Sequence, residues 1–125
     1  MARCMRAMLA MPMFERIATA KVKLVTIIAS SELQDRIIED LREAGAGGYT
    51  ITRASGGGLH GPRVRGIWDT GNVRIESLVS TDVAERVFEH ITQAYADLPF
   101  TAFAVDVEAV PPEHFLKPSR GPRLR

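Results

Sequence analysis

Hydrophobic and polar residues follow the two-residue period of a β-strand in several parts of the chain. The stretch VKLVTIIA is apolar and β-branched on both faces after Lys23, as expected for a central strand that is covered on both sides. Three later stretches alternate as half-buried strands do. The four predicted strands are residues 22–29, 49–54, 73–79 and 102–108.

Two of these stretches have clearly different faces. In the third, Arg74, Glu76 and Leu78 share one face, and the opposite face is formed by Val73, Ile75, Ser77 and Val79. In the last, Phe103, Val105 and Val107 face one side, and the other side carries Ala102, Ala104, Asp106 and Glu108.

A helical period predicts two helices between the strands. In the first, which spans about residues 32–44, Ser31 and Gln34 fit a capping box and Gly45 supplies the stop. Its apolar stripe is Leu33, Ile37, Leu41 and Ala44. For the second helix, Asp82 with Glu85 is the predicted cap, and Leu98–Pro99 ends it. Its stripe is Val83, Val87, Ile91 and Tyr95, with Phe88 beside it.

The resulting order, β-α-β-β-α-β, predicts an α+β, ferredoxin-like fold: an antiparallel four-stranded sheet with two helices on one face. The second sheet face is then open, and a partner subunit could cover it. We expect the folded domain to span residues 21–110, between a disordered leader at 1–20 and a basic, mobile C-terminal tail at 111–125. A long loop separates strands two and three.

Charge and cysteine content narrow the class of protein. The net charge of +1 hides a mildly acidic domain, because residues 21–110 hold nine Lys or Arg and thirteen Asp or Glu, between basic ends. This balance argues against a dedicated nucleic-acid binder. Cys4 is the only cysteine, which excludes an intramolecular disulfide and favours the cytoplasm. No apolar run approaches the roughly 20 residues of a membrane span.

The loop after the second strand carries the candidate chemistry. Gly56, Gly58 and Gly61 spell G-x-G-x-x-G, but a strand follows where a dinucleotide fingerprint opens a helix, and the lysine of a phosphate loop is missing. What remains is a flexible loop whose glycine N–H groups and guanidinium groups suit an anion. The arginines are Arg53, Arg63 and Arg65, and the loop also contains His60 and Trp68.

Other reactive residue types have simpler interpretations. The carboxylates of the first helix are typical of a solvated face, and no serine lies in a nucleophile elbow. The three histidines have no metal-ligand spacing. Arg74 and Glu76, two residues apart on one strand face, favour a structural ion pair, with a nucleotide contact as the alternative.

The succession of segments resembles the PII signalling family over about residues 21–110. Two motifs carry the resemblance: GYTIT is similar to the G-x-T-V-T that precedes the mobile T-loop in that family, and VRIESLV to the V-K-I-E-I-V-V that follows it. The resemblance implies a homotrimer that binds an adenine nucleotide in each cleft between subunits. It also implies that Thr50 contacts adenine and that Leu78 lines the adenine pocket.

The chain departs from the nitrogen-sensing members of that family. It has ADLPFTA where they carry a second glycine-rich loop, and its T-loop lacks the uridylylated tyrosine, which puts 2-oxoglutarate sensing in doubt. The pattern is similar to the PII-like subgroup linked to inorganic carbon uptake and carboxysomes, whose members respond to ADP, ATP or AMP together with bicarbonate. The tail RGPRLR has no cysteine, so the redox control of some members is not implied.

From the residues and the resemblance together we expect a non-catalytic, trimeric, cytoplasmic sensor. Its T-loop would be ordered by ligand and would control a partner such as a bicarbonate transporter or a carboxysome-related protein. The expected nucleotide-binding residues are Thr50, Leu78, Arg53, Gly56, Gly58, Arg74, Glu76, Phe100, Lys117 and Arg120. The expected anion and T-loop residues are Arg63, Arg65, His60 and Trp68.

Three alternatives compete with the sensor. A metal-binding, ferredoxin-like trimer of the divalent-cation-tolerance type is the nearest. A nucleotide-hydrolysing enzyme would need an acid, base or nucleophile near the arginines. An RNA-binding module would need exposed aromatic residues on its central strands, and residues 73–79 have none.

Overall fold

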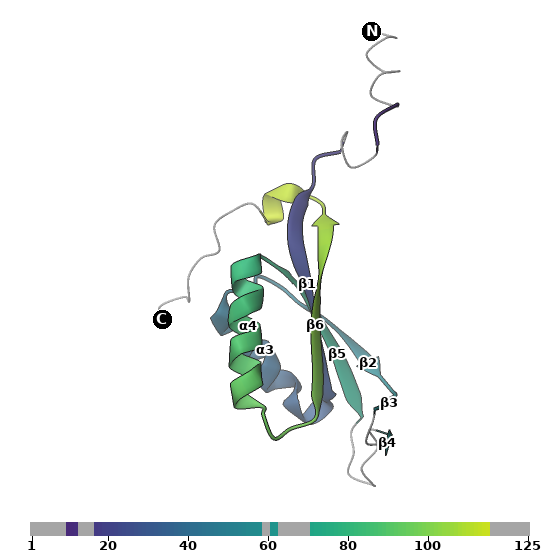
Figure 1. The fold of residues 1–125 in the computed structure, drawn as a ribbon, viewed down its shortest axis with the longest axis vertical. Coiled ribbons are helices and arrows are strands. Elements are labelled where there is room, and N and C mark those ends of the chain that lie inside the picture. Colours follow the sequence, from purple (N-terminus) through teal and green to yellow (C-terminus); the bar gives the residue numbers. More distant parts are fainter. Residues whose placement is uncertain (1–9, 13–16, 59–60, 63–70, 116–125) are drawn as a thin grey trace.

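The computed structural model describes residues 10–12, 17–58, 61–62 and 71–115. Four long strands and two helices account for most of them (Figure 1). In chain order the elements are β1 (Ala20–Ser30), the 3₁₀ turn η1 (Ser31–Leu33), α3 (Gln34–Ala44), β2 (Thr50–Ala54), β3 (Gly57–Gly58), β4 (Gly61–Pro62), β5 (Asn72–Val79), α4 (Thr81–Ala94), β6 (Phe100–Ala109) and the 3₁₀ turn η2 (Pro112–His114).

The four long strands form one antiparallel sheet in the order β2-β5-β1-β6. Strand β1 lies between β5 and β6, with Leu24 opposite both Leu78 and Val105. Both helices cover the same face of the sheet (Figure 1). The predicted ferredoxin-like fold is confirmed, and the alternation of side chains along each strand now determines which residues reach which face.

The core lies between the sheet and the helices. On the sheet side it is formed by Val25, Ile27, Ala29, Val73, Ile75 and Val79, and on the helix side by Ile37, Leu41, Val83, Ala84, Val87, Ile91 and Tyr95. Because the helical stripes repeat every three or four residues, each helix buries one side and turns the other to solvent. The predicted stripes of both helices are confirmed.

Both predicted helix caps are wrong, whereas the predicted stop of the first helix is confirmed. Ser30, not Ser31, caps the first turn, and the Ser31 hydroxyl instead donates to the Gly71 carbonyl at 2.9 Å. The cap of α4 is Ser80, whose hydroxyl accepts from the Val83 N–H at 3.3 Å, so Asp82 already lies inside the helix. Gly45 ends α3 with φ 108°, a left-handed conformation that favours glycine.

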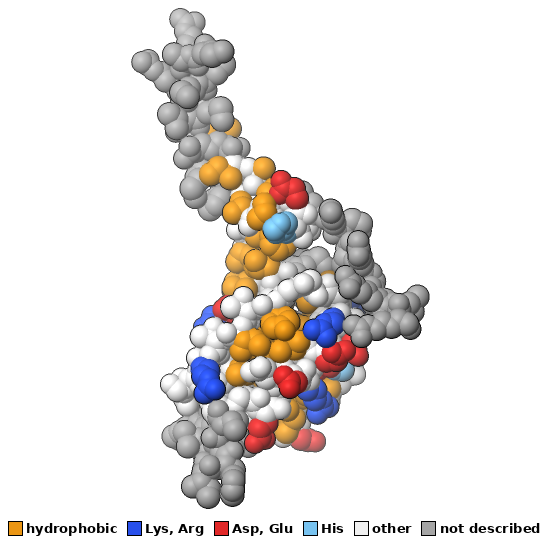
Figure 2. Space-filling view, turned by 180° about the vertical axis from the view of Figure 1, so that it is seen from behind, with side chains coloured by type: hydrophobic (Ala, Val, Ile, Leu, Met, Phe, Trp, Pro, Cys, Tyr) orange, Lys and Arg blue, Asp and Glu red, His pale blue; other side chains and the backbone are white. Residues whose placement is uncertain are grey.

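Strand β6 turns its small residues toward the helices. Ala102 and Ala104 pack against the core, whereas Phe103 and Val105 remain 39% and 45% exposed on the open face. With Leu24, Ile28 and Leu78 they make this face apolar. Figure 2 shows hydrophobic side chains gathered on the surface seen from behind, bordered by charged ones. Such a patch is typical of a surface that is covered in an assembly.

A second, smaller cluster closes the end of the sheet opposite the loop. Ala20, Val22 and Ala109 are buried there, with Val107 and Phe115 packed against them. The folded chain therefore extends at both ends beyond the predicted domain of residues 21–110. The rest of the predicted leader and tail, residues 1–9, 13–16 and 116–125, lies outside the described residues.

A polar cluster joins the two helices at Tyr95, which is only 2% exposed. Its hydroxyl donates to Asp40 Oδ2, and His90 Nε2 lies 3.0 Å from the other Asp40 oxygen. The Arg36 guanidinium lies over the tyrosine ring, 4.8 Å from its centre. Burial, and then the hydrogen bond to Asp40, raise the pKa of Tyr95 above its ordinary value.

The raised pKa makes stability depend on Tyr95 at alkaline pH. The folded state favours the protonated phenol, so this contribution is complete below the ordinary tyrosine pKa near 10 and falls as the pH rises above it. In urea unfolding at pH 9 to 11.5, Tyr95→Phe should remove a loss of up to about 1.4 kcal/mol per pH unit above pH 10. The matched control Tyr49→Phe changes a 46%-exposed side chain and should keep the loss. Equal slopes for wild type and Tyr95→Phe would contradict this assignment.

Candidate functional site

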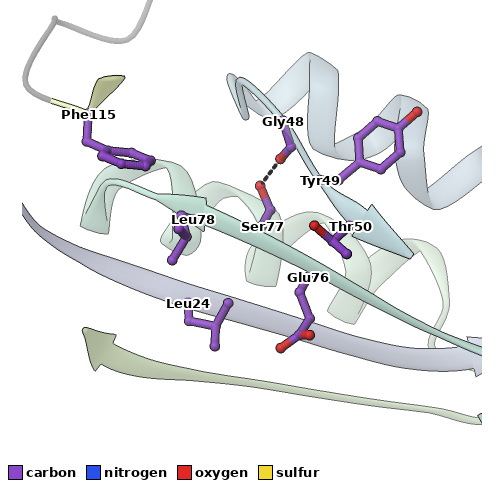
Figure 3. Close-up of a pocket in the computed structure, with 8 residues that line it drawn as sticks. All are labelled: Leu24, Gly48, Tyr49, Thr50, Glu76, Ser77, Leu78 and Phe115. Carbon is purple, nitrogen blue, oxygen red and sulfur yellow. Dashed lines mark hydrogen bonds between the residues drawn. The ribbon is translucent and has the colours of Figure 1, made fainter. Parts of the chain in front are cut away.

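A groove of about 500 Å³ opens on the sheet at Thr50, where the pairing of β2 with β5 begins (Figure 3). Its size is within the range of small-molecule sites. It is lined by Leu24, Gly48, Tyr49, Thr50, Glu76, Ser77, Leu78 and Phe115. Two of these, Thr50 and Leu78, are the residues expected at an adenine pocket.

The floor of the groove is apolar because β2 is shorter than its neighbours. Pairing between β2 and β5 begins at Thr50 opposite Glu76, whereas β5 continues to Val79. Leu78, two residues further along the same face, therefore has β1 on one side only and stays 36% exposed beside Leu24. The difference in length between β2 and β5 therefore leaves apolar side chains uncovered beside the start of β2.

One wall of the groove is the chain that leads into β2. The Ser77 hydroxyl donates to the Gly48 carbonyl at 2.5 Å, which fixes this wall to β5. Ser77 is itself only 3% exposed. The Tyr49 ring points away from the groove in Figure 3, so the wall is formed mainly by backbone and by Thr50.

Charged groups lie on the loop side of the groove. Glu76 Oε2 accepts from the Thr26 hydroxyl and from Arg74 Nη2, each at 3.3 Å. Arg74 and Glu76 thus pair with each other along the strand, and the Arg74 side chain is still 43% exposed. Thr52 lies opposite Arg74 in the β2–β5 register, one step closer to the loop than Thr50. Polar and cationic groups therefore continue from the groove toward the glycine–arginine loop.

The structure separates two of the expected nucleotide-binding residues from this face. Arg53 pairs with the core residue Val73, and alternation places it on the opposite face from Thr50. Phe100 packs against the helix-side core with its ring 6.3 Å from that of Tyr95. Since Phe100 lies opposite Ala29, it is also at the far end of the sheet from Leu78. Phe100 does not line the groove.

The described parts of the loop form a short ladder. Gly57 pairs with Pro62 and Gly58 with Gly61, as strands β3 and β4, and a side chain at Gly56 would meet open space. The other expected binding residues, His60, Arg63, Arg65, Trp68, Lys117 and Arg120, lie outside the described residues.

Phe115 lines the groove but was not among the site residues expected from the sequence. The residue follows Pro111–Pro112 in a stretch without strand or helix period, which is why it was assigned to the tail. Only the 3₁₀ turn brings it back over the sheet. An aromatic residue directly after a proline turn was the one available signal, and it does not specify a contact.

The described ranges contain neither a candidate metal site nor a helix that could span a membrane. Within residues 10–12, 17–58, 61–62 and 71–115, no three His, Cys, Asp or Glu side chains lie where they could hold a metal ion. None of the helices described there has the length and apolar character to cross a membrane.

The fold and the groove define a ferredoxin-like domain with a small-molecule-sized groove, and comparison with known proteins identifies its family. The model of the family "Nitrogen regulatory protein P-II" matches residues 22–114. The chain belongs to the PII family, and the resemblance seen in the sequence is confirmed. This match also favours a PII-like protein over the metal-binding alternative.

Solved structures support the same conclusion. A putative PII-like signalling protein from Thermus thermophilus is 34% identical, with a TM-score of 0.68, over 80% of this chain and 100% of that one. CPII from Thiomonas intermedia, bound to ADP and bicarbonate, is 23% identical with a TM-score of 0.69 over 78% and 96%. Its apo form is 18% identical with a TM-score of 0.62 over 74% and 95%. At these lower identities CPII shows a common fold. None of the curated proteins compared matches the chain.

The hydrogen bond between Ser77 and Gly48 should hold the groove wall. Ser77→Ala removes the donor from a buried position, so we expect the free energy of unfolding to fall by about 1 kcal/mol. Ser55→Ala, at an exposed residue between β2 and β3, is the control and should leave stability unchanged. Urea unfolding measures both, and equal stability of the two variants would show that the bond does not hold the wall.

Proposed function

We propose that this chain is a non-catalytic sensor that binds an adenine nucleotide (ADP, ATP or AMP) together with bicarbonate in the clefts of a homotrimer. The observation that carries the proposal is the groove itself. It joins an apolar floor of Leu24 and Leu78 to a polar wall at Thr50, at the root of a glycine–arginine loop.

The groove suits a purine base. A base has apolar faces and a hydrogen-bonding edge, so the leucine floor offers contact to a face while the Thr50 hydroxyl and nearby backbone groups offer partners to the edge. The Glu76 carboxylate, also in the lining, is an acceptor for an exocyclic amine. These roles place the base over the leucine floor, with its edge toward Thr50.

The phosphates then point toward the loop. From Thr50 to Ala54 the strand rises about 13 Å at roughly 3.3 Å per residue, a span that an extended nucleoside diphosphate can follow. Among the described residues, Arg74 supplies a cation along this path. Its side chain is half-exposed, and it lies opposite Thr52, the next residue after Thr50 on the same face of β2. Gly56, Gly58, Arg63 and Arg65 supply N–H donors and guanidinium groups for phosphate and bicarbonate, and Lys117 and Arg120 close over the same anions.

The open sheet face supports the proposed assembly. Phe103 and Val105, with Leu24, Ile28 and Leu78, form an apolar surface that a second copy of the chain would cover. Covering this face brings another subunit to the open side of the groove. Solved CPII, a protein of the same fold, contains ADP and bicarbonate, which supports this choice of ligands.

Regulation is assigned to the loop. Ligand bound at its root favours one loop conformation, and that conformation changes the affinity for a cytoplasmic partner surface, such as a bicarbonate transporter or a carboxysome-related protein. Sensing of this kind requires no reaction of the nucleotide, so ADP and ATP should be released unchanged.

Calorimetric titration tests the nucleotide site. Wild-type protein should bind about one ADP per chain, and bicarbonate at fixed pH and ionic strength should tighten binding about 5-fold or more. Thr50→Ala should weaken ADP binding about 3- to 10-fold, the value of one hydrogen bond. Thr92→Ala, on the exposed side of α4, is the matched control and should bind as wild type.

The proposal fails if wild-type protein binds none of ADP, ATP and AMP at millimolar concentration. Steady phosphate release from ATP, at a rate that follows protein concentration, would instead identify an enzyme.

Light scattering on the purified chain tests the trimer. Val105→Asp places a carboxylate in the apolar face, where its burial costs several kcal/mol, so the trimer should dissociate. Leu98→Asp is the control, because Leu98 is similarly exposed (38%) but lies in the turn between α4 and β6. A wild-type monomer, or a Val105→Asp trimer as stable as wild type, would refute this assembly.

A further inference from the structure

Phe115 is the one described aromatic ring that faces the groove. Tyr49, the other aromatic residue in the lining, directs its ring away from it (Figure 3). The Phe115 ring lies beside Leu78 and at the opposite end of the groove from Thr50 in the same view. The groove therefore has a hydrogen-bonding end, an apolar floor and an aromatic end.

The Phe115 ring is held in place by its own chain. The 3₁₀ turn η2 closes with hydrogen bonds from the His114 N–H to the Pro111 carbonyl at 3.2 Å and from the Phe115 N–H to the Pro112 carbonyl at 3.0 Å. The ring packs against the cluster of Ala20, Val22 and Ala109 at the end of the sheet. It is only partly buried by these contacts, so apolar ring surface remains for another group.

A partly exposed aromatic ring at one end of a small-molecule groove offers its face to a planar ligand. Offset stacking needs no hydrogen bond and tolerates any base, because every base has a π-face. Thr50 and the Gly48 backbone lie where the edge of a base seated on Leu78 would need partners. The two ends of the groove thus recognise different properties of one planar group.

We infer that Phe115 is a ligand-contacting residue that stacks on the nucleotide base and closes the base site from the C-terminal side. The inference rests on the proposed function, since it assigns a wall to the same groove. It makes the C-terminal turn η2 a part of the site, so that base binding and the position of this turn are coupled. Stacking contributes affinity for the base without choosing among bases, while Thr50 and Glu76 supply the choice.

Three substitutions at Phe115 separate stacking from packing. In ADP titrations, Phe115→Ala should weaken binding about 5- to 100-fold, the range for loss of one base–aromatic stack. Phe115→Leu keeps apolar packing on Ala20 and Val22 but removes the π-face, so it should also bind ADP more weakly than wild type. Phe115→Tyr keeps the ring and should bind nearly as wild type. Thermal unfolding without ligand identifies any variant that has lost its fold. If Phe115→Leu is folded, its ADP affinity decides between the two roles: weaker binding than wild type indicates stacking, and equal binding indicates packing.

A fluorescence measurement reports the contact directly. In Phe115→Trp protein, ADP should quench the added tryptophan with the same saturation curve as binding, because the base stacks on it. Wild-type protein, which contains Trp68 alone, provides the baseline. Leu98→Trp places a tryptophan in the exposed turn between α4 and β6, away from the groove, and should show no quenching beyond that baseline.

The outcomes distinguish this inference from the function on which it rests. Wild-type binding of ADP together with unchanged affinity in Phe115→Ala and Phe115→Leu, or with no added quenching in the Phe115→Trp protein, would overturn the stacking role and leave the sensor intact. Absence of nucleotide binding by the wild-type protein would remove both. Weakened binding in the two ring-free variants, retained binding in Phe115→Tyr and saturable quenching would establish the contact.

Discussion

The whole structure depends on β1 having two apolar faces. Val25 and Ile27 are buried under the helices, and on the other face Leu24 and Ile28 need a cover as well. Two helices of 11 and 14 residues can cover only one face of a four-stranded sheet. The chain therefore satisfies its central strand on one side by itself, and the proposed assembly supplies the other side.

The groove arises from a mismatch of strand lengths on that same open face. Strand β2 has five residues and β5 has eight, so the β5 residues beyond Glu76 have no strand partner on the β2 side. A step of this kind exposes apolar side chains next to the polar Thr50 side chain at the start of a strand, where a base finds both. Its position at the start of β2 links it mechanically to the loop that follows Ala54.

The same arrangement links three segments that are far apart in sequence. The entrance to β2, the middle of β5 and the turn after β6 meet around one space of about 500 Å³. The Ser77 bond holds the first to the second, and Phe115 packing holds the third to β1. A ligand in this space contacts all three, so its binding energy can be distributed between the loop before β5 and the chain after β6.

The sequence by itself determined the order of elements, the helical stripes and the Gly45 stop. Periodicity and glycine conformation are local properties, so a single chain reveals them.

Only the tertiary structure decided that Ser30 and Ser80 cap the helices, because neighbouring polar residues compete for the same orphan N–H groups. It also decided that Ala102 and Ala104 of β6, rather than Phe103 and Val105, face the helices. Alternation separates two faces without saying which one is covered. Phe115 joined the site for the same reason: its contact is with strands much earlier in the chain, and no local pattern encodes it.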